Sequence, residues 1–215
     1  MDARAEPAPD AERVWWLRAL LVLQSPRPVF AALRDDSDDA AQARQEPLLA
    51  IAFLAGIALV LSTTIAGRLL DDPEYDGLLI AVWAIVAGGI HGIVAYFVVG
   101  TAVYLGASLA GGVGSYRRAR HVLGFAAVPL ALSLIVLPVR LAAFGSDGFR
   151  SGGSDTGAAD SAFEALEVGF LIWTLALLAL GTRTVHGWSW PRALAATALP
   201  AAIPALALAR AYGFF

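Results

Sequence analysis

The 215-residue sequence contains no cysteine and no lysine, and it has only three histidines. The absence of cysteine excludes disulfide bonds, a thiolate nucleophile and zinc–sulfur sites. All fifteen basic residues are arginines, which together with the high alanine and glycine content indicates a GC-rich bacterial genome. The net charge is −3, so the chain lacks the basic excess with which proteins bind nucleic acids.

Motifs of known catalytic sites are absent from the sequence as well. The chain has no HExxH metal-binding motif and no dinucleotide-binding fingerprint, and the stretch 111–114 (GGVG) lacks the lysine of a phosphate-binding loop. The histidines, at positions 91, 121 and 186, are expected at different depths of the protein, which argues against a shared metal site. We therefore expect no enzymatic activity, no metal and no cofactor.

Long apolar segments dominate what is present. Hydrophobic residues make up 58% of the chain and the mean hydropathy is +0.67, whereas a soluble domain is about 45–50% apolar. A helix needs about 20 mostly apolar residues to cross the hydrocarbon core of a membrane. The sequence predicts an all-α, polytopic membrane helix bundle over residues 47–215, with five spans at about 47–67, 78–110, 120–144, 162–182 and 191–212.

The second span is unusually long. Residues 78–110 would form a helix of about 50 Å, against a hydrocarbon core of about 30 Å. Two spans joined by a turn need roughly 42 residues, which is more than the segment contains. One long, tilted or bent helix is therefore favoured over a hairpin.

The arginines indicate the orientation, because basic residues near the ends of spans stay on the cytoplasmic side. Arg117, Arg118 and Arg120 cluster directly after the glycine-rich stretch 111–114. With five spans and a cytoplasmic N-terminus, eleven arginines lie inside and four outside. We expect this topology, with an external C-terminus and external loops at 71–76 and 145–161, in a bacterial inner or plasma membrane.

The N-terminal region is expected to lie outside the spans. Residues 1–10 are polar and contain two prolines, which predicts a disordered tail. Residues 11–46 include the stretch 14–23 (VWWLRALLVL), which is too short to span and suits a helix in the membrane interface. Two interpretations stay open for the short helices of this segment: they anchor the chain to the membrane surface, or they pack on the ends of the bundle.

Several turn and helix motifs resemble a known family. They are Ser25-Pro26 followed by Phe30, the stretch 111–116 (GGVGSY) leading into 120–129 (RHVLGFAAVP), and the loop 186–193 (HGWSWPRA). Together with the five spans, these motifs resemble the Yip domain family over roughly residues 14–212. The resemblance implies a five-span α-helical fold with a cytoplasmic N-terminus.

The same resemblance implies a role that does not carry over directly. Eukaryotic members of the family are Ypt/Rab-interacting membrane proteins that contact small GTPases and partner membrane proteins in Golgi and endoplasmic-reticulum trafficking. A bacterial chain of this type lacks that machinery. The long N-terminal domain of many eukaryotic members is also reduced here to about 45 residues, and the shared motifs supply neither ligands nor nucleophiles.

Four ionisable side chains form a candidate intramembrane polar site: His91, Arg140, Glu164 and Glu167. Ionisable groups within a membrane are costly and mark functional sites by default. His91 lies in the middle of the second span, where the simpler interpretation is a neutral imidazole that is hydrogen-bonded to a neighbouring helix. Arg140 can extend to the outer interface or pair with Glu164 or Glu167.

Two further sets of residues can make contacts. Ala84, Gly88, Gly92 and Gly100 recur at multiples of four and predict a face for close helix packing, within the chain rather than between copies. The cytoplasmic basic loop with Arg117, Arg118 and Arg120 can bind anionic lipid headgroups or an acidic partner, although a purely topological role also explains it.

These observations favour a non-enzymatic integral membrane protein of the Yip type, which acts through the lipid bilayer, anionic lipids or other membrane proteins. The sequence leaves its oligomeric state open. The alternative is a small transporter or channel-like protein that uses His91 and the spans kinked by Pro129, Pro138, Pro200 and Pro204.

Overall fold

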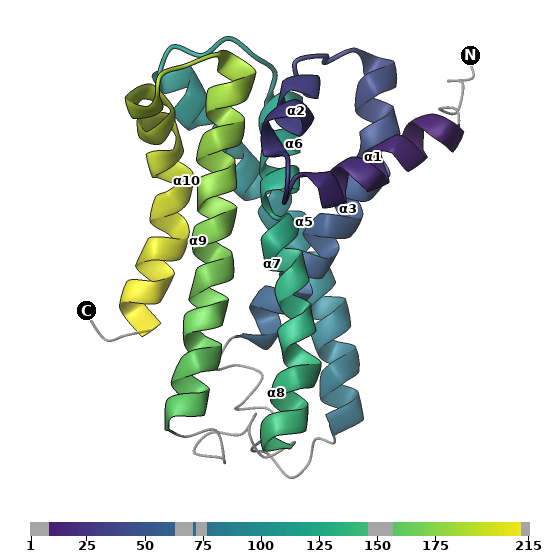
Figure 1. The fold of residues 1–215 in the computed structure, drawn as a ribbon, viewed down its shortest axis with the longest axis vertical. Coiled ribbons are helices and arrows are strands. Elements are labelled where there is room, and N and C mark those ends of the chain that lie inside the picture. Colours follow the sequence, from purple (N-terminus) through teal and green to yellow (C-terminus); the bar gives the residue numbers. More distant parts are fainter. Residues whose placement is uncertain (1–8, 63–70, 72–76, 146–156, 212–215) are drawn as a thin grey trace. The chain divides into compact units, whose positions relative to one another are not determined.

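A computed structural model of the chain describes residues 9–62, 71, 77–145 and 157–211. Every regular element in this part of the chain is a helix (Figure 1). In chain order the elements are α1 (Pro9–Leu21), α2 (Pro26–Ala32), α3 (Asp38–Leu61), α5 (Gly77–Leu109), α6 (Tyr116–Ala126), α7 (Val128–Leu132), the 3₁₀ helix η1 (Ser133–Ile135), α8 (Val136–Phe144), α9 (Ala158–His186) and α10 (Trp190–Ala211). The predicted tail up to residue 8 and most of the two predicted loops, at 72–76 and 146–156, lie outside the described residues.

Four segments of the described residues are long and apolar enough to cross a membrane, which makes the chain a multi-pass membrane protein. They are Asp38–Leu61, Gly77–Leu109, Tyr116–Phe144 and Ala158–His186. The fifth predicted span, at 191–212, coincides with α10, which is not among these four. The structure therefore shows an all-α, polytopic fold with four such segments among the described residues.

The first span begins earlier than the apolar pattern predicts. Helix α3 starts at Asp38, nine residues before the predicted start at residue 47, and it contains Pro47 without a break. Asp38 and Asp39 lie in its first turn, where carboxylates interact favourably with the helix dipole. The Ser37 hydroxyl oxygen also accepts a hydrogen bond from the Ala40 amide at 3.4 Å. Polar capping residues, rather than hydropathy, therefore define this helix start.

The second predicted span is one helix. α5 runs without interruption for 33 residues and ends in a turn that requires glycine, because Gly111 has a φ of +78°. The amide of Gly112 donates to the carbonyl of Ala107 at 2.8 Å, and that of Gly111 donates to the carbonyl of Ser108 at 2.9 Å. This pair of bonds is a Schellman motif, which stops the helix and turns the chain towards α6.

The third predicted span is interrupted. α6 ends at Ala126, and the three-residue η1 lies between α7 and α8. Pro129 and Pro138 each lie in the first turn of a new helix, where the missing amide costs no hydrogen bond. Pro200 and Pro204 instead lie inside α10.

The chain divides into two compact units. Unit 1 comprises Met1–Ala50, Tyr96–Ala126 and Leu175–Phe215, and unit 2 comprises Ile51–Ala95 and Ala127–Thr174. Unit 1 thus holds the starts of α3, α6 and α10 together with the ends of α5 and α9. Its core is apolar, and the fully buried side chains include Val22, Phe30, Leu33, Leu48, Phe125 and Leu178.

In unit 2 the backbones of α3 and α5 approach closely. A Cβ atom on Gly88 would lie 2.8 Å from the Ile57 Cα, and one on Gly92 would lie 2.8 Å from the Gly56 Cα. Ala84, one helical turn before Gly88, is 1% exposed. Three members of the predicted small-residue face therefore lie on the side of α5 that packs against α3.

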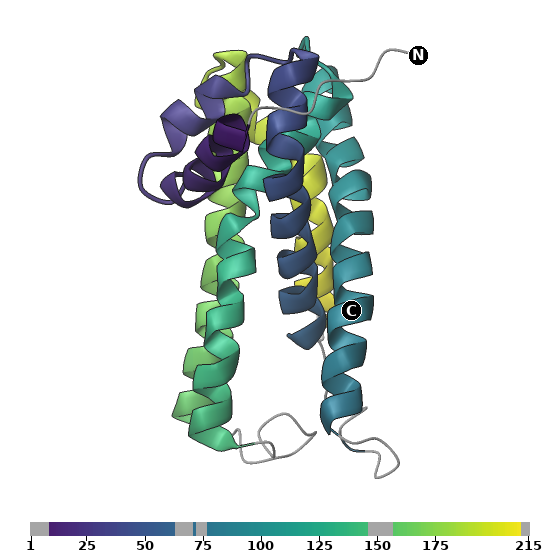
Figure 2. The ribbon, with the colours of Figure 1, turned by 90° about the vertical axis from the view of Figure 1, so that its right-hand side faces the viewer.

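The first two helices belong to unit 1. Both views show α1 lying across the beginning of α3 rather than along it (Figures 1 and 2). Its buried side consists of Trp15, Ala19 and the following Val22, and the Trp15 ring lies 5.6 Å from the ring of Phe125 in α6. α1 is therefore packed onto the helices of unit 1, and its direction is transverse to that of α3.

Candidate functional site

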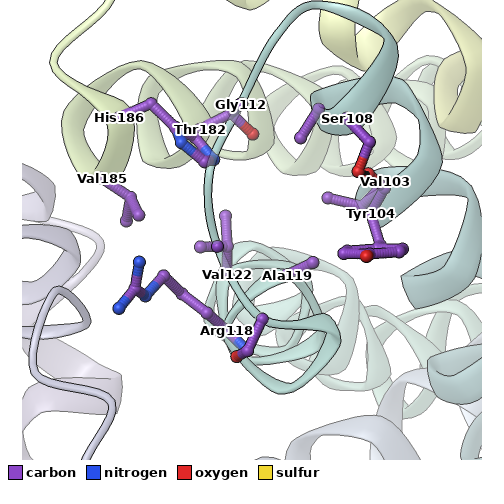
Figure 3. Close-up of a pocket in the computed structure, with 13 residues that line it drawn as sticks. Val103, Tyr104, Ser108, Gly112, Arg118, Ala119, Val122, Thr182, Val185 and His186 are labelled. Carbon is purple, nitrogen blue, oxygen red and sulfur yellow. Dashed lines mark hydrogen bonds between the residues drawn. The ribbon is translucent and has the colours of Figure 1, made fainter.

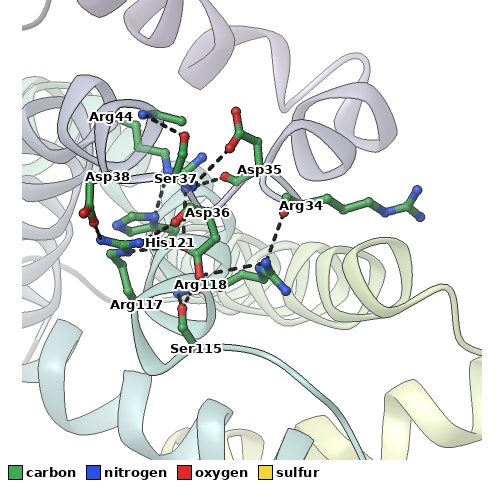
Figure 4. A network of polar contacts seen from close by, with 11 residues as sticks. Arg34, Asp35, Asp36, Ser37, Asp38, Arg44, Ser115, Arg117, Arg118 and His121 are labelled. Carbon is green, nitrogen blue, oxygen red and sulfur yellow. Dashed lines mark hydrogen bonds and ion pairs between the residues drawn. The ribbon is translucent and has the colours of Figure 1, made fainter.

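The start of α6 binds a carboxylate of the chain itself. The Ser115 hydroxyl oxygen accepts a hydrogen bond from the Arg118 amide at 3.0 Å and so caps the helix. The same hydroxyl donates a short hydrogen bond to the carboxylate of Asp36. Helix N-termini attract anions through their free amides and their dipole. In this protein Asp36, from the segment between α2 and α3, is the anion at that position (Figure 4).

Two arginines of the predicted basic loop surround the same carboxylate. Arg117 Nε lies 3.2 Å from Asp36 Oδ1, and Arg118 Nη2 lies 3.8 Å from Asp36 Oδ2. Arg117 also forms a 2.6 Å ion pair with Asp38 and donates to the main-chain carbonyl of Asp36. The positive charges of Arg117 and Arg118 are therefore balanced within the chain, before any lipid or partner is considered.

A fully buried arginine connects this cluster to the interior. Arg44 is 0% exposed; its Nε donates to Nδ1 of His121 at 2.8 Å and its Nη2 donates to the main-chain carbonyl of Asp35 at 2.8 Å. Its Nη2 also lies 3.6 Å from Asp36 Oδ1. We call this set the N-terminal clamp; its members are Asp36, Arg44, Ser115, Arg117, Arg118 and His121.

Electrostatics keep the clamp charged at neutral pH. Partial burial raises the pKa of the Asp36 carboxyl, but hydrogen bonds from Ser115 and Arg117 and the charges of Arg117 and Arg118 lower it further, so that the net value lies below the usual 3.8. The neighbouring Asp35 carboxyl accepts a hydrogen bond from the Ser37 amide, which lowers its pKa. Both carboxyl groups are therefore negatively charged at neutral pH and balance the charges of the nearby arginines.

The third arginine of the predicted basic loop has aromatic neighbours. The Arg120 guanidinium lies 4.6 Å from the ring centre of Phe97, 4.8 Å from that of Tyr116 and 5.5 Å from that of Tyr96. A Cβ atom on Gly100 would lie 2.5 Å from the Arg120 Cγ, so this glycine makes room for the arginine stem. Gly100, predicted to join the small-residue face, thus packs against a side chain of α6 instead of against α3.

Further contacts fasten the N-terminal segment and the glycine-rich loop. Arg34 Nη2 donates to the carbonyl of Thr184 at 2.6 Å, and Arg118 Nη2 donates to the carbonyl of Arg34 at 3.0 Å. Arg192 donates to the carbonyls of Ala110 and Gly111 at 2.8 and 3.0 Å. In unit 1 these hydrogen bonds join the chain after α2 to α6 and α9, and they join α10 to the turn that ends α5.

A small cavity lies beside the clamp. It has a volume of about 20 Å³ and is lined by residues of α5, the glycine-rich loop, α6 and α9 (Figure 3). Its polar lining consists of Tyr104, Ser108, Ser115, Arg118, Thr182 and His186, and valines and alanines supply most of the rest. This volume fits about one water molecule.

In unit 2 the structure brings together part of the predicted intramembrane site. Arg140 Nη1 lies 3.6 Å from a Glu167 oxygen, and Arg140 Nη2 lies 3.3 Å from a carboxylate oxygen of Asp160, which the sequence did not indicate. A second cavity of about 20 Å³ adjoins Arg140 and Glu167. No ion pair joins Glu164 to another described residue, and its side chain is exposed.

His91 does not belong to that cluster. Its side chain is exposed on α5, and it lines neither of the two cavities. None of the described residues forms a hydrogen bond or ion pair with it. The described residues also contain no group of three or more His, Asp or Glu side chains placed to hold a metal ion.

Sequence reasoning missed Asp36, Arg44 and His121 as partners. The only local signals were the Arg34-Asp35-Asp36 run after an apolar face and an arginine three residues before Pro47. Neither signal indicates a contact with α6, because Asp36 and Arg117 are 81 positions apart in the chain.

One of the comparisons with known proteins identifies a family. The model of the Yip1 domain matches residues 20–211, which include α2 through α10 and therefore the whole clamp. Neither a curated protein nor a solved structure matches the chain.

Proposed function

Since this match covers most of the chain, the protein belongs to the Yip1 domain family, and we propose that it acts without catalysis, through contacts of α1 with lipids of the cytoplasmic leaflet. One observation carries the proposal: the sides of α1 that face away from the buried Trp15 are apolar and exposed. The exposed side chains, each at least 40% accessible, are Val14, Trp16, Leu17, Leu20 and Leu21.

The depth of α1 supports burial of this face in lipid. Trp15 stacks near Phe125, which follows the first residue of α6, Tyr116, by nine positions. At about 1.5 Å per residue, this places α1 roughly 13 Å along α6 from its start. A transverse helix at that depth, with apolar side chains exposed on its outer side and Arg18 in its last turn, can place those apolar side chains in the membrane interface.

The clamp gives this helix a fixed position. It holds the segment between α2 and α3 on the start of α6, and α2 directly precedes this segment in the chain. In this proposal the two interpretations of the N-terminal segment are combined: one side of α1 packs on the bundle, and the other side enters the membrane interface.

The proposal includes five spans with a cytoplasmic N-terminus. α10 has 22 residues and is about 33 Å long, enough for the hydrocarbon core. Unit 1 contains, in chain order, the start of α3, the end of α5, the start of α6, the end of α9 and the start of α10. Starts and ends alternate in this way when five antiparallel helices cross a membrane. The arginine excess near these ends supports their cytoplasmic location. A C-terminal reporter enzyme that is active only outside the cytoplasm should be active, and an inactive, folded reporter would contradict this topology.

The lipid contact is tested by site-directed spin labelling, which is straightforward because the chain has no cysteine. A label on Leu20→Cys in proteoliposomes should collide more often with oxygen, which partitions into lipid, than with a water-soluble nickel complex. Asp39→Cys, at an exposed polar position near the same end of the bundle, is the matched control and should show the opposite preference. Equal nickel accessibility at both positions would refute the lipid contact.

A further inference from the structure

The outer face of α5 in unit 2 carries a polar side chain among apolar ones. His91 is exposed there, between the exposed Ile90 and Val94. It follows the start of α5 by 14 residues and precedes its end by 18, or about 21 and 27 Å along the helix. The imidazole therefore lies far from both ends of the span, and its side chain is exposed.

An exposed imidazole at this depth is unfavourable in lipid alone. Ionisable side chains in spans nearly always face protein or a water-filled cavity, because hydrocarbon offers no hydrogen-bonding group. His91 has neither in unit 2: it lines no cavity there that the structure describes, and it has no hydrogen-bonding partner among the described residues. A protein surface that covers this face would remove the cost.

The residues along this face have the spacing of a helix–helix contact. Ala87, His91 and Val94 are separated by four and three residues. Spacing of this kind places side chains on one line and is the pattern by which two helices pack at a shallow angle. Ala87 is half-buried, whereas Val94 is 54% exposed.

We propose that a second copy of this chain covers this face, in a parallel, two-fold contact of α5 with α5 in which the two His91 side chains hydrogen-bond to each other. Two copies inserted with the same topology hold each residue at the same depth in the membrane. In a two-fold contact, each residue of the face therefore lies close to the same residue of the other copy, near the symmetry axis. A neutral imidazole has one donor and one acceptor nitrogen, and it can therefore pair with an identical imidazole. The small Ala87 lets the backbones approach beside this pair.

The first test uses single-cysteine cross-linking of purified protein in proteoliposomes, where no other protein can take the partner's place. Val94→Cys should form a disulfide-linked dimer on mild oxidation. Ile85→Cys is the control: it is 50% exposed and nine residues earlier on α5, which is half a revolution around the helix. We expect at least fivefold more dimer for Val94→Cys.

Three outcomes of the cross-linking experiment would contradict the proposed dimer. Equal or greater cross-linking at Ile85→Cys would show random collisions or a different interface. A folded Val94→Cys protein that stays monomeric, or that in native membranes cross-links only to a different protein, would overturn the self-association.

The second test asks whether the imidazole itself matters. His91→Leu should weaken the dimer about threefold to thirtyfold, as expected for loss of a hydrogen bond between helices. His91→Asn also has a donor and an acceptor and should retain most of the association. The dimer fraction is measured at several protein-to-lipid ratios by single-molecule photobleaching. A His91→Leu variant that dimerises like the wild type would overturn the role of His91.

Discussion

Arg44 and His121 meet in the interior of unit 1, where the Arg44 Nε donates a 2.8 Å hydrogen bond to the His121 Nδ1. The two residues are 77 positions apart, and they are 0% and 4% exposed. Because a guanidinium can only donate, Nδ1 is the acceptor and the imidazole carries its hydrogen on Nε2. The contact joins α3 to α6 and, through Asp36, ties both helices to the N-terminal segment.

Removal of the Arg44 side chain should be costly. Arg44→Ala leaves the His121 acceptor, the Asp35 carbonyl and the Asp36 carboxylate without their buried donor, and loss of one partner of such a pair costs roughly 3–5 kcal/mol. The change is measured as the free energy of unfolding in detergent micelles. Arg18→Ala, which removes a guanidinium that lies 4.4 Å from the Trp15 ring, is the control and should cost about 1 kcal/mol or less. Similar losses for the two variants would contradict the importance of the buried hydrogen bonds.

Acid should weaken the clamp through Asp36. Its pKa is lower in the folded protein than the usual 3.8, so its contribution is fully present at neutral pH and is lost as the pH falls through the folded value. Asp36→Asn should therefore be less stable than the wild type at pH 7, by about 1–3 kcal/mol. The gap between the two should narrow below about pH 4.

The measurement for this prediction is the thermal unfolding midpoint as a function of pH. Asp39→Asn changes an exposed carboxyl in the first turn of the same helix and is the matched control. A stability gap between wild type and Asp36→Asn that stays constant down to pH 2 would show that the Asp36 charge does not stabilise the fold.

Two glycines of α9 should respond oppositely to alanine. A Cβ atom on Gly181 would lie 2.7 Å from a Phe30 ring carbon and 2.8 Å from a Val122 methyl carbon, whereas one on Gly169 would have no neighbour within 4 Å. Gly181→Ala should therefore destabilise unit 1 by about 1–3 kcal/mol through overpacking. Gly169→Ala should be neutral or stabilising by up to about 1 kcal/mol, because alanine favours the helix.

The cause of the Gly181 effect can be isolated. Phe30→Leu makes space at the contact, so the double variant should lose less stability than the sum of the two single losses. Strict additivity of the two losses would indicate that Gly181 is not limited by the Phe30 ring.

The ion pairs of Arg140 can be tested by a double-mutant cycle. Arg140→Met leaves Asp160 and Glu167 without a cation at 3.3 and 3.6 Å, respectively. We expect a loss of roughly 3 kcal/mol, and we expect the double variant Arg140→Met, Glu167→Leu to recover at least about 1 kcal/mol of it. Unfolding is followed in detergent by loss of helical circular dichroism. Glu167→Leu alone completes the cycle, and a loss in the double variant equal to the sum of the two single losses would exclude a net favourable interaction between the two side chains.

Part of this arrangement could be predicted because it depends on local physical properties. The continuous apolar stretch at 78–110 is too short for a hairpin, and α5 is indeed one helix. The spacing of Ala84, Gly88 and Gly92 places them on one side of that helix, and this side packs against α3. The family, too, could be recognised from turn and helix motifs such as the stretch 111–116, and the family model matches residues 20–211.

Other features depend on contacts that no local pattern encodes. Arg117 and Arg118 were candidates for contact with anionic lipids or a partner, or for a purely topological role, and their actual neighbour in space is Asp36. Hydropathy predicted the start of the first span at residue 47, whereas the caps at Ser37 and Asp38 start the helix earlier.

The sequence by itself determined that this protein crosses the membrane several times as helices, because hydrophobicity and helix length act along the chain. It also determined that α5 ends at the glycine-rich stretch, because Gly111 can adopt a positive φ. Only the tertiary structure decided that Asp36 binds at the start of α6 and that Arg44 is buried against His121. Charges separated by about 80 residues choose their partners by distance in space, and that distance is set by how the helices pack.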